Sequence, residues 1–195
     1  MTKKFQLKQY VTLALVALAI FITNHKDVAA NEEGFFNWLN GFKTKAINQG
    51  ISKDTIEKAF EGIEYKEKVV NLDKKQPEKT ITFQDYKQRV IPQSRVRKAR
   101  QMLKENYALL DEIEKKFGVQ KRFIVALWGI ESDFGRRMGG FTIPHALATL
   151  AYEGRRREFF SKELMNALKI ADEGHVKTEN FKGSWAGAMG QCQFM

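Results

Sequence analysis

Apolar side chains recur every three or four residues along most of the chain, which is the spacing of a helix with one buried face. The spacing is clearest over residues 94–117, where the apolar positions are Val96, Ala99, Leu103, Tyr107, Leu110, Ile113 and Phe117. Gly118 follows directly, and glycine commonly ends helices because it readily adopts a left-handed backbone conformation. This pattern predicts one helix over 94–117.

The same spacing in other segments predicts helices over 35–47, from Ser52 to Phe60, over 123–131, from Pro144 to Leu150 and over 155–173. Residues 62–80 are polar and contain Pro77, so we expect an extended connection there. No segment shows a sustained alternation of apolar and polar residues, which is the pattern of a half-buried strand. The sequence therefore predicts an all-α fold.

The N-terminal residues follow a different pattern, which begins with a basic region containing Lys3, Lys4 and Lys8. An almost wholly apolar run over 11–22 follows, and it is shorter than the ~20 residues that a membrane-spanning helix needs. Small residues then lead to Ala30, as at a signal-peptidase cleavage site. We therefore predict a cleaved secretory signal peptide, with an uncleaved membrane anchor as the alternative.

The predicted division of the chain is a signal peptide over residues 1–30 and an exported domain over residues 31–195. Export places the domain in an oxidising compartment. Cys192 is the one cysteine of the chain, so an intramolecular disulfide is excluded and stability has to come from a packed core. His145 and His175 are far apart in the sequence, so the chain lacks metal-ligand spacing and we predict neither a metal nor a cofactor.

Charge gives a weaker indication of partners. The chain has a formal net charge of +10 and a sequence pI of about 9.6. Such an excess of cations favours a polyanionic partner or simply a solvated basic surface, and the sequence leaves both interpretations open. The basic residues do not form one stripe interleaved with aromatic side chains, so we expect no nucleic-acid partner. Peripheral association with an anionic membrane surface stays open on the same grounds.

Glu131 ends the nearly all-apolar segment 123–131. A carboxylate at the mouth of an apolar helix is expected to be desolvated and to stay protonated near neutral pH, as a general acid must. The alternative is a glutamate that simply leaves the core for solvent at a helix end. Asp133 lies two positions further on, where a helix would point it away from Glu131. We therefore expect Asp133 to cap or turn the segment that follows.

Two further segments could contribute to a site. Residues 182–190 are rich in glycine and alanine, and small residues let another backbone or a ligand come close, although they also form good helix-packing surfaces. Arg155, Arg156 and Arg157 could hold an anion at the start of a helix or form a solvated basic turn. Taken alone, these residues leave both interpretations of each segment open.

Four ordered blocks of residues stand out: Trp128-Gly129-Ile130-Glu131-Ser132-Asp133-Phe134-Gly135, Ala146-Leu147-Ala148-Thr149-Leu150-Ala151-Tyr152, Arg155-Arg156, and Lys182-Gly183-Ser184-Trp185-Ala186-Gly187-Ala188-Met189-Gly190 with Gln193-Phe194-Met195. In order and spacing they closely resemble the lytic murein transglycosylase B family over residues 83–195. The segment from Phe35 is compatible with this family but less diagnostic.

The resemblance implies a lysozyme-like α-helical domain that acts on peptidoglycan glycan strands. Members cleave the β-1,4 bond between N-acetylmuramic acid and N-acetylglucosamine without a water nucleophile. The C6 hydroxyl of the muramic acid attacks C1 and leaves a 1,6-anhydro end. By motif, Glu131 is the acid that protonates the leaving oxygen and then the base that accepts the hydroxyl proton. One carboxylate suffices, because intramolecular attack supplies the nucleophile by proximity.

The resemblance also implies residues that bind the substrate. Ser184 and Gln193 match positions that line the site. Arg155 and Arg156 match a pair expected near the glycan or its peptide stem, and Tyr86 is a looser match to a site aromatic. The place of action that the resemblance implies is the periplasm of a Gram-negative bacterium.

The sequence departs from the family pattern at its C-terminal end. Members continue after the Gln-Phe-Met block with further helices and sugar-binding residues, and Cys192 stands where a small residue is usual. Residues 183–195 also carry no charge, which is atypical of a solvated chain end. We therefore expect an incomplete catalytic domain that is weak or inactive as it stands, with a non-catalytic peptidoglycan-binding module or a gene remnant as the alternative.

Overall fold

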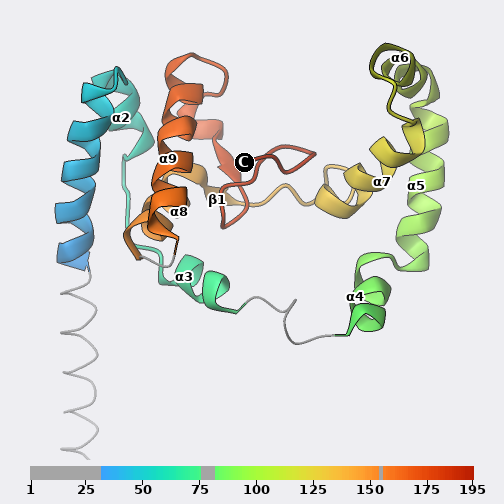
Figure 1. Cartoon of the computed structure of the whole chain (residues 1–195), viewed down its shortest axis with the longest axis horizontal. Helices are drawn as coiled ribbons and strands as arrows, with labels where there is room; N and C mark the ends of the chain where they lie inside the picture. Colours follow the sequence, from blue (N-terminus) through green and yellow to red (C-terminus); the bar gives the residue numbers. More distant parts are fainter. Residues whose placement is uncertain (1–31, 76–81, 154–155) are drawn as a thin grey trace, which may run out of the picture.

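The computed structural model describes residues 32–75, 82–153 and 156–195. The predicted signal peptide and Arg155 lie outside these ranges. Within them the secondary structure is helical except for two short strands of two residues each (Figure 1). The predicted all-α class is confirmed.

The helices form two lobes, which Figure 1 shows side by side. The first lobe contains the helical residues 32–48, α2 (Lys53–Ala59), α3 (Glu67–Lys74), α8 (Ile143–Glu153) and α9 (Arg157–Asp172). The second lobe contains α4 (Phe83–Val90), α5 (Gln93–Glu105), α6 (Tyr107–Phe117) and α7 (Lys121–Ser132). The helices predicted over 35–47, 52–60, 123–131, 144–150 and 155–173 are all present, with bounds shifted by a few residues.

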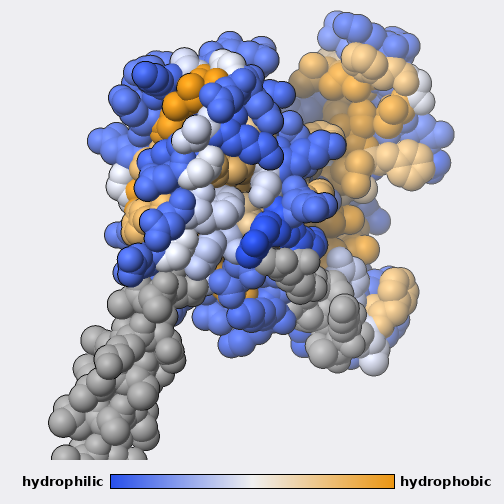
Figure 2. Space-filling model, turned by 60° about the vertical axis from the view of Figure 1, so that its left-hand side comes forward, coloured by the Kyte–Doolittle hydropathy of each residue, from blue (hydrophilic) through white to orange (hydrophobic). Residues whose placement is uncertain are grey.

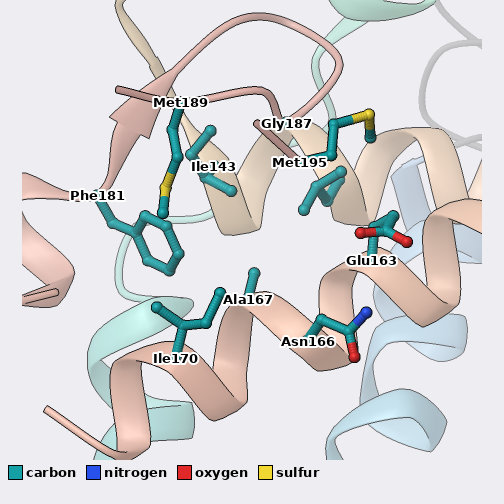
Figure 3. Close-up of a pocket in the computed structure, with 10 residues that line it drawn as sticks. Ile143, Glu163, Asn166, Ala167, Ile170, Phe181, Gly187, Met189 and Met195 are labelled. Atoms are coloured by element: carbon teal, nitrogen blue, oxygen red, sulfur yellow. The ribbon is translucent and has the colours of Figure 1, made fainter. Parts of the chain in front are cut away.

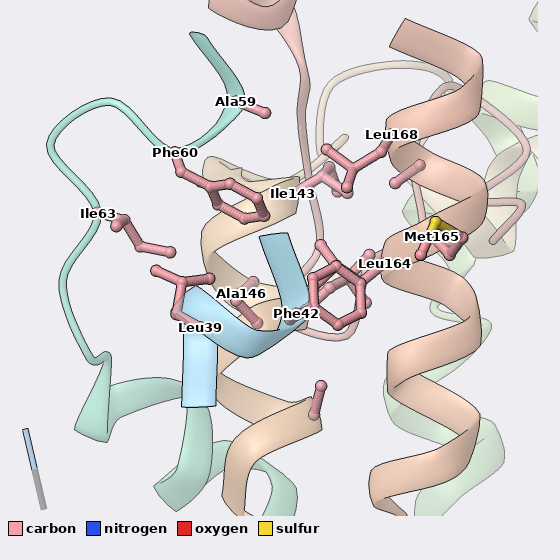
Figure 4. Packing of buried hydrophobic residues seen from close by; sticks show 14 of the residues in the cluster. Leu39, Phe42, Ala59, Phe60, Ile63, Ile143, Ala146, Leu164, Met165 and Leu168 are labelled. Carbon is pink, nitrogen blue, oxygen red and sulfur yellow. The ribbon is translucent and has the colours of Figure 1, made fainter. Parts of the chain in front are cut away.

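The core of the first lobe forms around α8, which is buried along most of its length. Its small side chains Ala146 and Ala148 let neighbouring helices approach closely, and α9 packs against it most extensively. Large apolar side chains from the other elements fill the remaining space, as Figure 4 shows for Leu39, Phe42, Phe60, Leu164 and Leu168. Burying one such side chain stabilises the fold by roughly 1.5–3 kcal/mol.

Ser52 begins α2, as the sequence predicted. Its Oγ accepts a hydrogen bond from the Thr55 N–H at 3.2 Å, which satisfies a donor that the helix start would otherwise leave open. The same Oγ donates to the Asp172 carboxylate at 2.5 Å. Hydrogen bonds from Ser52 and then Thr55 hold the pKa of Asp172 below its usual value. The cap therefore also joins the start of α2 to the end of α9.

The prediction of one helix over 94–117 is wrong in one respect, because the chain breaks at Asn106 into α5 and α6. The backbone N–H and the side-chain Nδ2 of Asn106 both donate to the Met102 carbonyl, at 3.0 and 2.9 Å. An asparagine side chain can compete in this way with regular helical hydrogen bonding. The break turns α6 so that Leu110 clusters with Val125 of α7 and with Phe134.

The expected extended connection over 62–80 is also wrong in part, since α3 forms within it. Val69 and Val70 of α3 are buried against the first lobe, and this packing outweighs the polar composition of the segment. The pattern of apolar residues also missed α4. Its N-cap is Thr82, whose Oγ accepts from the Asp85 N–H at 3.2 Å.

The C-terminal segment is paired with the connection between the lobes. Strand β1 (Phe141–Thr142) precedes α8 and pairs antiparallel with β2 (Lys182–Gly183), which follows the short 3-10 helix η2 (Thr178–Asn180). The Ile143 N–H continues the ladder by donating to the Phe181 carbonyl at 2.9 Å. In Figure 1 the segment after β2 extends from the first lobe toward α7.

The second lobe exposes much apolar surface, visible as the orange area over it in Figure 2. Six large apolar side chains of α6 and α7 are between 41% and 64% exposed: Tyr107, Leu109, Phe117, Phe123, Leu127 and Ile130. We call these six the apolar face of α6 and α7. Among the described residues, none of the helices combines the length and apolar character that crossing a bilayer requires.

Candidate active site

Glu131 lies in the last turn of α7, and its side chain is exposed. The desolvation expected from its place after an apolar run is therefore not found. The buried face of α7 is formed by Val125, Gly129 and Ser132, whereas Glu131 lies one turn from the exposed Leu127 and shares its face. The candidate acid is thus at the end of the apolar face of α6 and α7.

Asp133 ends α7, which confirms its predicted capping role. It adopts the left-handed conformation (φ 52°), and its N–H donates to the Trp128 carbonyl. The Asp133 carboxylate is 8% exposed and accepts from the Arg136 guanidinium at 2.8 Å, with Arg95 3.8 Å away. The hydrogen bond from Arg136, followed by the positive charges of Arg136, Arg95 and Arg137, lowers the pKa of Asp133. The Asp133 carboxylate is therefore ion-paired with these arginine side chains.

The turn after α7 is held in an uncommon backbone conformation. Asp133, Phe134 and Gly135 all have positive φ angles, and for residues other than glycine such a conformation costs energy that the surroundings must offset. The Phe134 ring packs back on α7, where a Cβ at Gly129 would lie 2.7 Å from it. Trp128 meets the same ring edge-on, with centroids 5.5 Å apart. These contacts fix the direction in which the chain leaves Glu131.

Of the two interpretations that the sequence left open for the 182–190 segment, the structure supports close approach of another backbone at Gly183. A Cβ at Gly139 would lie 2.0 Å from the Gly183 carbonyl oxygen, and Gly139 has a φ of +88°. Ser184 organises the loop that follows. Its Oγ accepts from the Ala186 and Ala188 N–H groups, at 3.3 and 3.0 Å. Ser184 therefore shapes the loop from within.

Gln191 and Gln193 bring the end of this segment to α7. The Gln191 carbonyl accepts from Oγ of Ser132 at 2.6 Å, and its side-chain oxygen accepts from the Trp128 indole N–H. Nε2 of Gln193 donates to the carbonyl of Met138, at 3.3 Å, in the connection that follows α7. Gln191 thus attaches the segment that contains Gln193 to Trp128 and Ser132, the residues on either side of Glu131.

The other predicted site residues lie elsewhere. Tyr86 is on α4 in the second lobe and is 42% exposed. Arg156 is in the first lobe, where its guanidinium donates to Asp73 at 2.8 Å and lies 4.7 Å from the centroid of the Phe160 ring. Within the described ranges, neither residue forms a hydrogen bond or ion pair with Glu131.

Sequence reasoning missed the contacts of Gln191, Ser132 and Trp128. The sequence contains one indication of these contacts, which is that the residues lie close in sequence to predicted site residues. Trp128 and Ser132 lie on either side of Glu131, and Gln191 precedes Gln193 by two residues. Among the described residues there is no group of three His, Cys, Asp or Glu side chains suited to hold a metal ion.

A small, partly open apolar space lies between α8, α9 and the C-terminal segment (Figure 3). Phe181 and Met189 line it from the C-terminal segment, Ile143 from α8, and Ala167 and Ile170 from α9. Its volume of about 40 Å³ is close to that of one water molecule. The space is too small for a sugar ring, so it serves as a packing seam for the C-terminal segment.

These features define a class: a two-lobed helical domain with a candidate acid at the exposed end of α7. The chain belongs to the transglycosylase SLT domain family, whose model matches residues 34–195. Over 80 residues it is 46% identical to the membrane-bound lytic murein transglycosylase B of Escherichia coli K12, and the match covers 40% of this chain and 22% of that protein.

Solved structures agree with this family. SltB3 of Pseudomonas aeruginosa, in complex with NAG-NAM-pentapeptide, has a TM-score of 0.79 and 40% identity over 83% of this chain and 43% of its own. SltB1 of the same organism, a soluble lytic transglycosylase, has a TM-score of 0.74 and 28% identity, over 81% of this chain and 54% of its own. The chain thus spans about half the length of these relatives or less.

Proposed function

We propose that residues 31–195 form the N-terminal part of a lytic transglycosylase catalytic domain, with peptidoglycan glycan strands as substrate. The observation that carries the proposal is the location of Glu131, at the exposed end of α7 and directly before the Ser132–Gln191 junction. A family match through this region supports it. The peptidoglycan fragment bound by SltB3 supports a substrate of glycan with a peptide stem.

In the proposed reaction Glu131 acts first as an acid and then as a base. Its carboxyl proton passes to the glycosidic oxygen as the bond from that oxygen to C1 of N-acetylmuramic acid breaks, which frees the 4-hydroxyl of N-acetylglucosamine. The C6 oxygen of the same muramic acid bonds to C1, and its proton returns to the Glu131 carboxylate. No water is consumed, and the intramolecular nucleophile benefits from proximity.

The exposed position of Glu131 sets a condition on this reaction. A general acid works best where water is excluded, and Glu131 shares an exposed face with Leu127. We propose that bound glycan, together with whatever covers the apolar face of α6 and α7, supplies this exclusion. Asp133 cannot act as the second carboxylate of a hydrolytic pair, because it is engaged by Arg136.

The remaining predicted residues have proposed roles in binding. Gln193 would contact the sugar through its side-chain amide, which bonds to the Met138 carbonyl in the connection that follows α7. Ser184 acts through the loop that its Oγ closes, and Tyr86 offers an exposed aromatic ring from α4. Arg156 keeps donors beyond the one that Asp73 accepts, because a guanidinium has five, so it could contact a peptide stem together with Arg155.

We further propose that the chain by itself cleaves peptidoglycan weakly. The matched relatives are about twice as long or more, and the apolar face of α6 and α7 is uncovered. Large exposed apolar patches mark surfaces that bind other protein or promote aggregation. The alternative is a non-catalytic module that binds peptidoglycan, which would retain binding to sacculi without any dependence on Glu131.

Export is the last part of the proposal. The basic and apolar start of the chain and the small residues up to Ala30 favour a cleaved signal peptide and action in the periplasm of a Gram-negative bacterium. Protein recovered from the cell envelope should then begin at Asn31. Recovery of membrane-bound protein that begins at Met1 would indicate an anchor instead.

The catalytic proposal is tested in a hybrid, in which the part of SltB3 beyond the match follows Met195. Glu131→Gln should lower release of 1,6-anhydromuropeptides from sacculi by about 10²–10⁴-fold, because the amide has a similar shape but no acidic proton. Glu112→Gln is the matched control, since Glu112 is an exposed glutamate of α6 in the same lobe. Equal turnover by Glu131→Gln and Glu112→Gln would show that the acid is a different residue.

A further inference from the structure

Gln191 joins the C-terminal segment to the end of α7 through two hydrogen bonds. Its side-chain Oε1 accepts from the indole Nε1 of Trp128, and its carbonyl accepts from Oγ of Ser132 at 2.6 Å. These partners lie on the two sides of Glu131 in the sequence. Both bonds therefore fix the segment to the turn of helix that carries the candidate acid.

The residues that contact the Gln191 side chain are themselves held in place by burial and hydrogen bonds. Ser132 is 0% exposed, and its Oγ also accepts from the Gly135 N–H at 3.0 Å. Gly135 has a φ of +80°, and a Cβ at this position would lie 2.9 Å from Oε1 of Gln191. The Gln191 amide thus lies on the Gly135 backbone and is bonded to Trp128. A side chain held by such rigid partners defines one position for the segment that carries it.

The segment that Gln191 anchors is a closed turn. The Met189 N–H donates to the Phe194 carbonyl at 2.8 Å, which closes residues 189–194. Within this turn, Nε2 of Gln193 donates to the Gly190 carbonyl at 2.8 Å, and Gln193 has a φ of +50°. A turn closed on itself moves as a unit, so its attachment to α7 decides where the Gln193 amide lies.

We propose that Gln191 is a positioning residue, whose bond to Trp128 holds the 189–194 turn against α7 and so fixes where the Gln193 amide lies relative to the turn of helix that carries Glu131. The inference rests on the proposed function for the roles of Glu131 and Gln193. Gln191 takes no part in proton transfer. Without its side-chain acceptor, the turn stays attached through the Ser132 bond and through the weaker bond from Gln193 to the Met138 carbonyl, and it can shift relative to α7 within these two attachments.

Three variants separate this role from general stability. Gln191→Leu removes the acceptor at nearly constant size, whereas Gln191→Glu keeps an oxygen that can accept from Trp128. Cys192→Ser is the matched control, because Cys192 is the exposed neighbour in the same turn. The urea midpoint of unfolding should be nearly the same in all three, since the Gln191 side chain lies at the surface.

The first measurement is the indole N–H signal of Trp128 in the ¹⁵N-labelled chain, assigned by its loss in Trp128→Phe. Gln191→Leu should shift this signal and speed its exchange with deuterium about tenfold, as expected for a lost hydrogen bond. Gln191→Glu and Cys192→Ser should keep the slow exchange. An unchanged Trp128 signal in Gln191→Leu overturns the proposal.

The second measurement is a titration with NAG-NAM-pentapeptide, followed through the side-chain amide signal of Gln193. We expect Gln191→Leu to weaken binding by about tenfold or more, because a Gln193 amide that has moved no longer meets the ligand in the required geometry. Gln191→Glu should restore the binding. Unchanged binding in Gln191→Leu, despite a shifted Trp128 signal, also overturns the positioning role. Failure of the proposed function has a different signature. In the hybrid with SltB3, Glu131→Gln would release anhydromuropeptides as fast as the hybrid that keeps Glu131, while the Trp128 signal of the chain still responds to Gln191→Leu.

Discussion

The guanidinium of Arg156 and the carboxylate of Asp73 form an ion pair of 2.8 Å that joins the start of α9 to the end of α3. The Asp73 side chain is 9% exposed, whereas that of Arg156 is 41% exposed and covers the Phe160 ring. A buried carboxylate that loses its partner is costly, because water does not replace the lost interaction. The pair therefore gives Arg156 a structural role in addition to any contact with substrate.

Arg156→Ala should lower the free energy of unfolding by roughly 1–3 kcal/mol, since Asp73 would be left buried without this partner. Urea denaturation measures the change. Lys162→Ala is the control, because Lys162 is an exposed cation of α9 and should change stability by less than about 0.5 kcal/mol. Equal stability of the two variants would show that the Asp73 pair contributes nothing and would favour a role for Arg156 in substrate binding alone.

Gly139→Ala should detach the C-terminal segment from the connection between the lobes. The added Cβ would lie 2.0 Å from the Gly183 carbonyl oxygen, at a backbone φ of +88°, so the strands must separate and we expect a loss of more than about 1 kcal/mol. Hydrogen exchange of the Ile143 N–H, which bonds to Phe181 across the same pairing, should speed up.

Gly140→Ala is the matched control for this change. A Cβ at Gly140 meets nothing within 4 Å. The control should therefore keep the Ile143 amide protected. If Gly139→Ala protects it equally well, the close approach of the two strands is not what holds the C-terminal segment.

Most helices could be predicted from the sequence. The predictions that were wrong concern the break at Asn106 and helix α3, and both depend on contacts that the sequence pattern does not show. At the break, the Asn106 side chain bonds to the Met102 carbonyl in addition to the backbone N–H of the same residue. Helix α3 forms because Val69 and Val70 find a buried surface on the first lobe. Neither event has a signal in the spacing of apolar residues, because both are decided by long-range packing or by a local polar competition.

The candidate site could also be predicted only in part from the sequence. The place of Glu131 at a helix end follows from the pattern, whereas its exposure does not, because a nearly all-apolar helix gives no periodicity to show which face is buried. The family resemblance supplied Gln193 and Ser184. The contacts of Gln191 join residues 59 and 63 positions apart, so only the folded chain reveals them.

The apolar face of α6 and α7 should tolerate polar substitution in the chain as it stands. Leu127 is 57% exposed, so Leu127→Gln loses little burial and should leave stability within about 0.5 kcal/mol while reducing self-association. Val125→Ala, on the buried face of the same helix, should cost about 2 kcal/mol. Light scattering and urea unfolding measure the two effects. Strong destabilisation by Leu127→Gln would mean that Leu127 is covered in solution, by a second copy or another partner.

His145 should make the stability of the chain depend on pH near neutrality. Its pKa is lowered from the usual value of 6.5, chiefly by burial and then by the charge of Lys66, against opposing interactions with the backbone of Ala59 and Glu61 and with the Glu64 charge. Below pH 6.5 the unfolded chain therefore binds a proton that the folded chain resists binding. The stability that neutral His145 contributes is complete above this pH and is lost as the pH falls toward the lowered value.

Urea unfolding between pH 7.5 and 5 should accordingly show a decline in the free energy of unfolding that His145→Gln largely abolishes. The carboxylates whose pKa values are lowered, such as Asp133 and Asp172, lose their contribution only at more acidic pH. His175→Gln is the control, because His175 is an exposed histidine after α9, and it should leave the decline in place. A decline that persists in full in His145→Gln would show that another group titrates in this range and that His145 is not desolvated in the folded chain.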